Sequence, residues 1–134
     1  MNKNIILIFT FLITFAFCSC EKTPGEGGNA RIRGKIWVKQ YDPFFTILQQ
    51  EYYGKDVNVE LTFGDNVSPD QTVKTNSTGD FEFQYLRKGK YKVTLYSQVF
   101  RDTINPSGLV TIDKTITING RKEILDIGTF IIQR

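Results

Sequence analysis

The sequence contains no histidine, and this absence excludes several classes of active site. Ser-His-Asp and Cys-His catalysis need an imidazole as general base, and many zinc sites need one as a ligand. The two cysteines, Cys18 and Cys20, lie close together near the N-terminus. The rest of the chain can therefore form neither a disulfide nor a thiolate metal cluster. We expect no metal and no other cofactor.

Alanine is also scarce, since it occurs only at Ala16 and Ala30. Phenylalanine, tyrosine, isoleucine and threonine are common instead, and β-branched and aromatic residues favour strands over helices. An excess of one charge is missing too: the formal net charge is +3, too small to indicate a nucleic-acid partner. A chain of 134 residues has room for one domain. We therefore expect a single all-β domain.

The first residues have the pattern of an export signal. Lys3 precedes an apolar run over 5–17, which is shorter than the roughly 20 residues of a membrane-spanning helix. Residues 17–20, Phe-Cys-Ser-Cys, resemble the lipobox of bacterial lipoproteins. That resemblance implies a signal peptide over 1–19 and a lipid such as palmitate on Cys20. There are two alternatives to a lipoprotein: the leader is cleaved to give a soluble secreted protein, or it stays uncleaved as a membrane anchor.

Residues 20–30 are predicted to form a flexible tether, because the sequence EKTPGEGGN at 21–29 has almost no apolar content. The domain would then occupy 31–134. Several acyl chains on one residue give stable membrane attachment. We therefore expect a lipid-anchored protein of the cell envelope, at the outer membrane, on its periplasmic or its surface face.

Alternating apolar and polar residues predict the strands of this domain, because successive side chains of a strand point to opposite faces. The clearest case is 75–95, where Phe81, Phe83 and Tyr85 should share one face, followed by Tyr91, Val93 and Leu95. Similar patterns predict strands at 31–39, 57–63, 71–75, 109–112, 115–118 and 123–132. Seven to nine short strands separated by turns indicate an antiparallel β-sandwich with Greek-key connections.

Two features near the C-terminus add detail to this expectation. Asn119-Gly120 lies between two apolar segments and predicts a β-hairpin. The strand at 123–132 has apolar residues on both faces, so it should be central in its sheet or covered by residues 41–54.

The spacing of glycines and aromatics over 75–95 resembles the carboxypeptidase regulatory-like family, a transthyretin-like or Cna-B-like β-sandwich. The matching residues are Thr75, Gly79, Phe81, Phe83, Leu86, Gly89, Tyr91, Val93 and Leu95. The resemblance extends over about 31–132. It implies a domain that is usually non-catalytic, such as an accessory domain, a stalk or a surface lipoprotein. Gly79 and Gly89 should allow positive φ in turns, and Tyr91 should bond a nearby backbone group.

The strand at 31–39 presents an unusual outward face. Four cations, Arg31, Arg33, Lys35 and Lys39, surround Trp37, which is the only tryptophan. One interpretation is a solvated face whose charges discourage edge-to-edge pairing. The other is a binding strip, in which Trp37 stacks on a sugar or a base and the cations meet an acidic partner.

Residues 41–54, YDPFFTILQQEYYG, fit neither a clean strand nor a long helix. A connection this long and apolar either caps the core or takes part in binding. Its candidate binding residues are Tyr41, Phe44, Phe45, Tyr52 and Tyr53.

Catalytic motifs are not apparent in the sequence. A Lys–Asn or Lys–Asp isopeptide crosslink needs a buried lysine, whereas Lys35 should point outward by strand parity. The sequence also has no phosphate-binding glycine loop. We expect a non-enzymatic envelope protein that binds a polysaccharide or a protein, or takes part in surface assembly. A purely structural spacer, or an accessory domain of an enzyme complex, are the alternatives.

Overall fold

The computed structural model describes residues 23–134, so the predicted signal peptide and Cys20 lie outside the described residues. All regular structure from residue 23 onward is β, which confirms the predicted fold class. Its elements are β1 (Glu26–Tyr41), β2 (Leu48–Tyr53), β3 (Asn58–Phe63), β4 (Gln71–Lys74), β5 (Asp80–Leu86), β6 (Gly89–Gln98), β7 (Leu109–Ile118) and β8 (Ile124–Gln133). This part of the chain has no helix that is long and apolar enough to cross a membrane.

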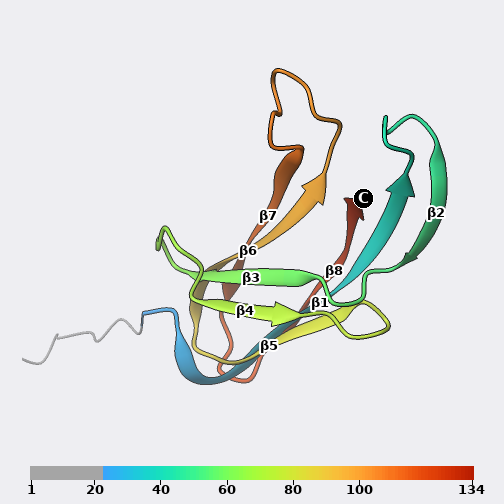
Figure 1. Ribbon diagram of the computed structural model, residues 1–134. Helices are drawn as coiled ribbons and strands as arrows, with labels where there is room; N and C mark the ends of the chain where they lie inside the picture. The colour runs from blue at the N-terminus through green and yellow to red at the C-terminus, as the bar shows by residue number, and fades with distance from the viewer. Residues whose placement is uncertain (1–22) are drawn as a thin grey trace, which may run out of the picture.

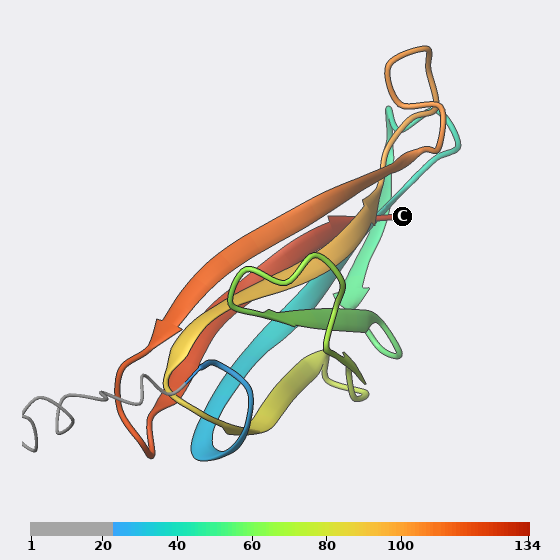
Figure 2. The same ribbon diagram turned by 90° about the vertical axis from the view of Figure 1, so that its left-hand side faces the viewer.

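The eight strands form two sheets that pack face to face (Figures 1 and 2). In one sheet, here called sheet A, β1 is central. β8 lies along one side of β1, while β5 and β2 pair with successive parts of the other side. In the second sheet, sheet B, the order is β4-β3-β6-β7. Among the described strands, β1 and β8 are the one parallel pair, because the chain crosses between the sheets before β8 returns beside β1.

The core lies between the two sheets and follows the predicted alternation. The expected inward residues Val59, Leu61, Val93 and Leu95 are fully buried, as is Tyr91. Phe81 and Phe83 bury aromatic rings as well, each contributing about 2–3 kcal/mol through burial. Gly79 and Gly89 have positive φ, 76° and 142°, as predicted for their turns.

Two irregularities change the alternation. Tyr85 has a left-handed φ of 60°, so its side chain is 66% exposed and Leu86 is buried in its place; the prediction of an inward Tyr85 was wrong. In β8, a bulge at Gly128 (φ 83°) lets both Ile127 and Phe130 face the core. β8 is therefore an edge strand with two inward stretches. It is neither central nor covered by residues 41–54, because β2 lies on the opposite side of β1.

The predicted hairpin at Asn119-Gly120 was also wrong. β7 pairs with β6 in sheet B, whereas β8 pairs with β1 in sheet A, so the turn connects the two sheets. The Glu123 carboxylate organises this turn by accepting hydrogen bonds from the backbone N–H groups of Asn119 and Gly120, both at 2.8 Å. These bonds stabilise the turn that carries the chain from sheet B to sheet A. The two strands predicted at 109–112 and 115–118 are one continuous strand, β7.

The folded domain begins earlier than the expected residue 31. β1 starts at Glu26, and Ala30 is fully buried. Gly28 lies so close to Leu86 that a Cβ would be 1.9 Å from the Leu86 carbonyl oxygen, which explains the glycine at that position. The tether prediction is therefore corrected for 26–30, because pairing with β5 orders these residues.

Candidate functional site

The outward face of β1, here called the sheet A strip, contains the cations predicted to surround Trp37. The strand register places an acidic residue of a neighbouring strand beside each of them. The resulting ion pairs are Arg31–Glu82 (3.3 Å), Arg33–Asp126 (3.3 Å), Lys35–Asp80 (2.9 Å) and Lys39–Glu51 (3.1 Å). The strip therefore carries equal positive and negative charge on these residues, which does not favour an acidic partner.

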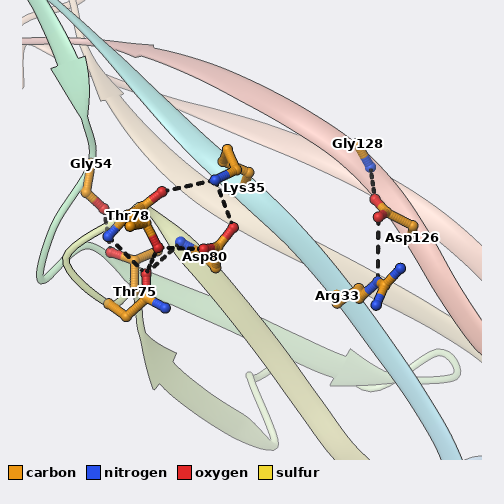
Figure 3. Close-up of polar contacts among 9 residues, drawn as sticks. Arg33, Lys35, Gly54, Thr75, Thr78, Asp80, Asp126 and Gly128 are labelled. Carbon is orange, nitrogen blue, oxygen red and sulfur yellow. Dashed lines mark hydrogen bonds and ion pairs between the residues drawn. The ribbon is translucent and has the colours of Figure 1, made fainter.

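Lys35 forms the shortest of the four ion pairs, and Figure 3 shows its contacts. Its Nζ donates to the Asp80 carboxylate and, at 3.0 Å, to the Thr78 carbonyl oxygen. The pKa of Asp80 is lowered, chiefly by a hydrogen bond from the Thr78 hydroxyl and then by Lys35. Exposed pairs of this kind contribute only about 0–1 kcal/mol each to stability. Their main effect is to neutralise the charge of the cations, which supports the interpretation of a solvated face.

Trp37 lies half-buried within this strip and contacts Tyr53 of β2. The two rings meet edge to face, with centroids 5.0 Å apart. Lys35 Nζ lies 4.8 Å from the Tyr53 centroid, a cation–π contact, and Tyr53 is 48% exposed. Ile131 of β8, opposite Trp37 in the register, completes a small apolar patch. This patch is smaller than the predicted strip because its neighbours cover part of both rings.

The segment 41–54 is not an irregular connection. It contains β2, which forms an antiparallel hairpin with the end of β1, so the prediction that it fits no clean strand was wrong. The hairpin separates the candidate aromatic residues. Tyr52 is partly buried and packs against the core, as the capping interpretation predicts, whereas Tyr53 points to the sheet A strip.

The turn of this hairpin, 42–47, is ordered by Asp42. Its carboxylate accepts hydrogen bonds from the backbone N–H groups of Thr46 (2.6 Å) and Ile47 (2.7 Å). The bond from Ile47 is the main reason that the pKa of Asp42 is lowered. Phe45, with a left-handed φ of 55°, stacks on Tyr41 at a centroid distance of 6.1 Å. Phe44 is 69% exposed at the tip of the turn.

A second apolar loop, 99–108, connects β6 to β7 and was not identified as a candidate site from the sequence. Phe100 and Ile104 are exposed in it, and Leu109 is exposed directly after it. The Asp102 carboxylate orders the loop by accepting from the backbone N–H groups of Ile104 (2.9 Å) and Asn105 (2.7 Å). The signal that could have identified this loop is the presence of Phe100 and Ile104 among the polar residues of 99–108.

The two loops lie side by side at one end of the sandwich, although their residues are more than fifty positions apart (Figures 1 and 2). Between them is a cleft of about 390 Å³, here called the loop cleft. Its lining residues are Pro43, Phe45, Gln98, Val99, Phe100, Arg101, Ser107, Gly108 and Leu109. Small-molecule sites typically have volumes of about 300–1,000 Å³ and combine apolar walls with a few polar groups. The loop cleft has both properties.

Comparisons with known proteins add little to this description. No family model and no curated protein matches the sequence. Among solved structures, a Pseudomonas aeruginosa protein provisionally described as a carbohydrate binding protein aligns over 84% of this chain and 92% of its own, with 15% identity and a TM-score of 0.47. A 9R-lipoxygenase from Cyanothece aligns over 92% of this chain, with 15% identity and a TM-score of 0.37. This chain spans 20% of the lipoxygenase chain. Likenesses this distant carry no argument about function.

Proposed function

We propose that the protein is a lipid-anchored, non-catalytic binding module of the cell envelope, and that the loop cleft is its recognition surface. The observation that carries this proposal is the convergence of partly exposed Phe45, exposed Phe100 and exposed polar side chains from two loops at one end of the domain. The described part of the chain begins toward the opposite end of the long axis, where the blue ribbon starts (Figure 2). A lipid on Cys20 would therefore leave the loop cleft facing away from the membrane.

The side chains of the loop cleft suit a neutral polysaccharide. Phe45 and Phe100 offer flat apolar faces for the C–H surface of a sugar ring. Gln98, Arg101 and Ser107 offer donors and acceptors for its hydroxyl groups. The cleft is small for a protein interface, since about 800 Å² per partner is typical of stable complexes.

Affinity electrophoresis tests this function directly. The protein is run through gels that contain a soluble neutral glucan, galactan or mannan, and we expect retardation by at least one of them. Phe100→Ala should weaken that binding about tenfold or more, because it removes a stacking surface. Tyr85→Ala is the matched control, since Tyr85 is likewise an exposed aromatic residue and lies outside the loop cleft.

The alternative outcomes are informative as well. Equal losses in both variants would place the binding elsewhere on the domain. Unretarded migration of the wild type in every gel would contradict a neutral-glycan ligand and favour a purely structural spacer. Circular dichroism melting of each variant separates lost binding from lost folding.

The proposed anchor has its own test. Cells that express the full chain are labelled with a palmitate analogue, and Cys20→Ala should abolish the label. Cys18→Ala should retain it, because the bulky Phe17 precedes Cys18 whereas the small Ser19 precedes Cys20. Undiminished label in Cys20→Ala would refute the anchor.

A further inference from the structure

A group of four cations lies at the end of the domain where the described chain begins. Arg87 and Lys88 form the turn between β5 and β6, and Arg121 and Lys122 lie in the crossing between β7 and β8. All four are exposed. They are here called the basic cluster.

The basic cluster differs from the sheet A strip in its lack of internal partners. Among residues 23–134, none of its four cations forms an ion pair, whereas all four cations of the strip do. The acid nearest in sequence, Glu123, accepts hydrogen bonds from the backbone N–H groups of Gly120 and Asn119. These bonds are the main reason that its pKa is lowered, and the charge of Lys88 makes a smaller contribution without forming an ion pair. Asp65, at the same end, pairs with Lys90 at 3.4 Å. The cluster therefore keeps an excess of positive charge.

Three of these cations converge on a hollow of about 530 Å³. It is lined by Gly27, Gly28, Asn29, Leu86, Arg87, Lys88 and Arg121. Arginine and lysine side chains around an open concavity are suited to phosphate groups, which arginine can bind through two parallel hydrogen bonds. The cluster thus has the chemistry and the shape for a phosphate-bearing headgroup.

The first described residues are attached to the same surface. The backbone N–H of Arg87 donates to the Gly25 carbonyl oxygen at 2.8 Å, and Gly89 packs against Pro24. Cys20 precedes residue 23 by three positions, which span at most about 10 Å when extended. That reach is close to the Debye length of about 8 Å at physiological salt. A lipid on Cys20 would therefore hold the basic cluster within electrostatic range of the membrane.

We propose that the basic cluster docks the domain onto anionic phospholipid headgroups and orients the loop cleft away from the bilayer. This inference rests on the proposed envelope location, but it concerns a different surface. Each cation close to an anionic membrane strengthens binding by about fivefold. Four cations should therefore contribute on the order of several hundredfold.

Vesicle co-sedimentation tests this inference without the lipid anchor. The chain from residue 20 onward, with Cys20→Ala, contains every core residue of the described fold, which lie between Ala30 and Ile132. We expect it to sediment with vesicles that contain phosphatidylglycerol, and to remain in solution with phosphatidylcholine alone. High salt should release it, and inorganic phosphate at the same ionic strength should compete no better than chloride.

Two charge-matched variants locate the binding. The cluster variant carries Arg87→Gln, Lys88→Gln, Arg121→Gln and Lys122→Gln, and should bind anionic vesicles at least a hundredfold more weakly. The strip variant carries Arg31→Gln, Arg33→Gln, Lys35→Gln and Lys39→Gln, and should keep most of the affinity despite the same change in net charge. If the cluster variant does not fold, the double variant Lys88→Gln/Lys122→Gln should still lose at least tenfold.

Three results would overturn this inference: equal losses in the cluster and strip variants, equal binding to both kinds of vesicle, or displacement by inorganic phosphate alone. The last result would identify a site for free phosphate. These outcomes are independent of the glycan gels and of palmitate labelling, so a failure here is distinguishable from a failure of the proposed function.

Discussion

The hydroxyl of Tyr91 lies 2.9 Å from the backbone nitrogen of Gly25, a residue 66 positions earlier in the chain. The hydroxyl accepts the Gly25 N–H and donates to the Arg87 carbonyl oxygen at 2.7 Å. The ring is fully buried and meets Phe63 edge to face. The predicted bond from Tyr91 to a nearby backbone group is therefore confirmed, and the same hydroxyl attaches the start of the described chain to β6.

Tyr91→Phe should destabilise the domain, because it leaves the Gly25 N–H and the Arg87 carbonyl without this partner. The expected loss is about 1–3 kcal/mol, measured by urea unfolding. Tyr96→Phe is the control, since within residues 23–134 the Tyr96 hydroxyl, on an exposed side chain, bonds only the Glu60 side chain. A loss in Tyr91→Phe no larger than in Tyr96→Phe would contradict a structural role for the buried hydroxyl.

Alkaline pH should weaken the same contact. Burial disfavours the phenolate and so raises the pKa of Tyr91 above its ordinary value. The neutral phenol therefore stabilises the fold fully below the unfolded pKa of about 10, and this contribution is lost as the pH rises through the higher folded pKa. We expect the wild type to lose stability more steeply above pH 10 than Tyr91→Phe does. Parallel pH profiles for the two proteins would refute this prediction.

Thr75 joins three segments through one buried hydroxyl. It donates to the Gly54 carbonyl after β2 (Figure 3). It also accepts the Val57 N–H before β3, while its own backbone follows β4. Thr75→Val keeps the shape but leaves both backbone groups unpaired, so we expect a loss of about 1–3 kcal/mol in thermal or urea unfolding. Thr72→Val, at an exposed position of β4, should cost less than half as much. Similar losses would show that the hydroxyl contributes little.

Trp37 fluorescence should distinguish the two candidate surfaces, because it is the only tryptophan and lies in the sheet A strip. Tyr53→Ala should shift its emission to the red, since it removes the ring that covers Trp37 at 5.0 Å. A glycan bound in the loop cleft should leave the emission of the wild type unchanged. A shift or quenching on glycan addition would move the binding to the strip.

Much of the fold follows from local sequence pattern. Alternation with period two depends only on strand geometry, so it correctly identified most inward residues of β3, β5 and β6, including Leu61, Phe83 and Val93, and failed at Tyr85, where the left-handed backbone interrupts the period. Glycine at 79 and 89 likewise marks turns through a property of the residue itself. Among the predicted binding residues, Phe45 lines the loop cleft, and its role in binding stays a prediction.

The local pattern could not predict the ion pairs or the sheet crossing, because both depend on which segments become neighbours in the fold. The cations around Trp37 read as a basic strip until the register places Glu82, Asp126, Asp80 and Glu51 beside them. Asn119-Gly120 reads as a hairpin until β7 and β8 enter different sheets.

The sequence by itself therefore determined that residues 23–134 form an all-β fold and which side chains fill most of its core, because burial follows from the period of each regular strand. Only the tertiary structure decided where charge is balanced and where it is not, and that Phe45 and Phe100 share one cleft. Those relationships arise between strands and loops that are distant in sequence, and no local pattern encodes such distances.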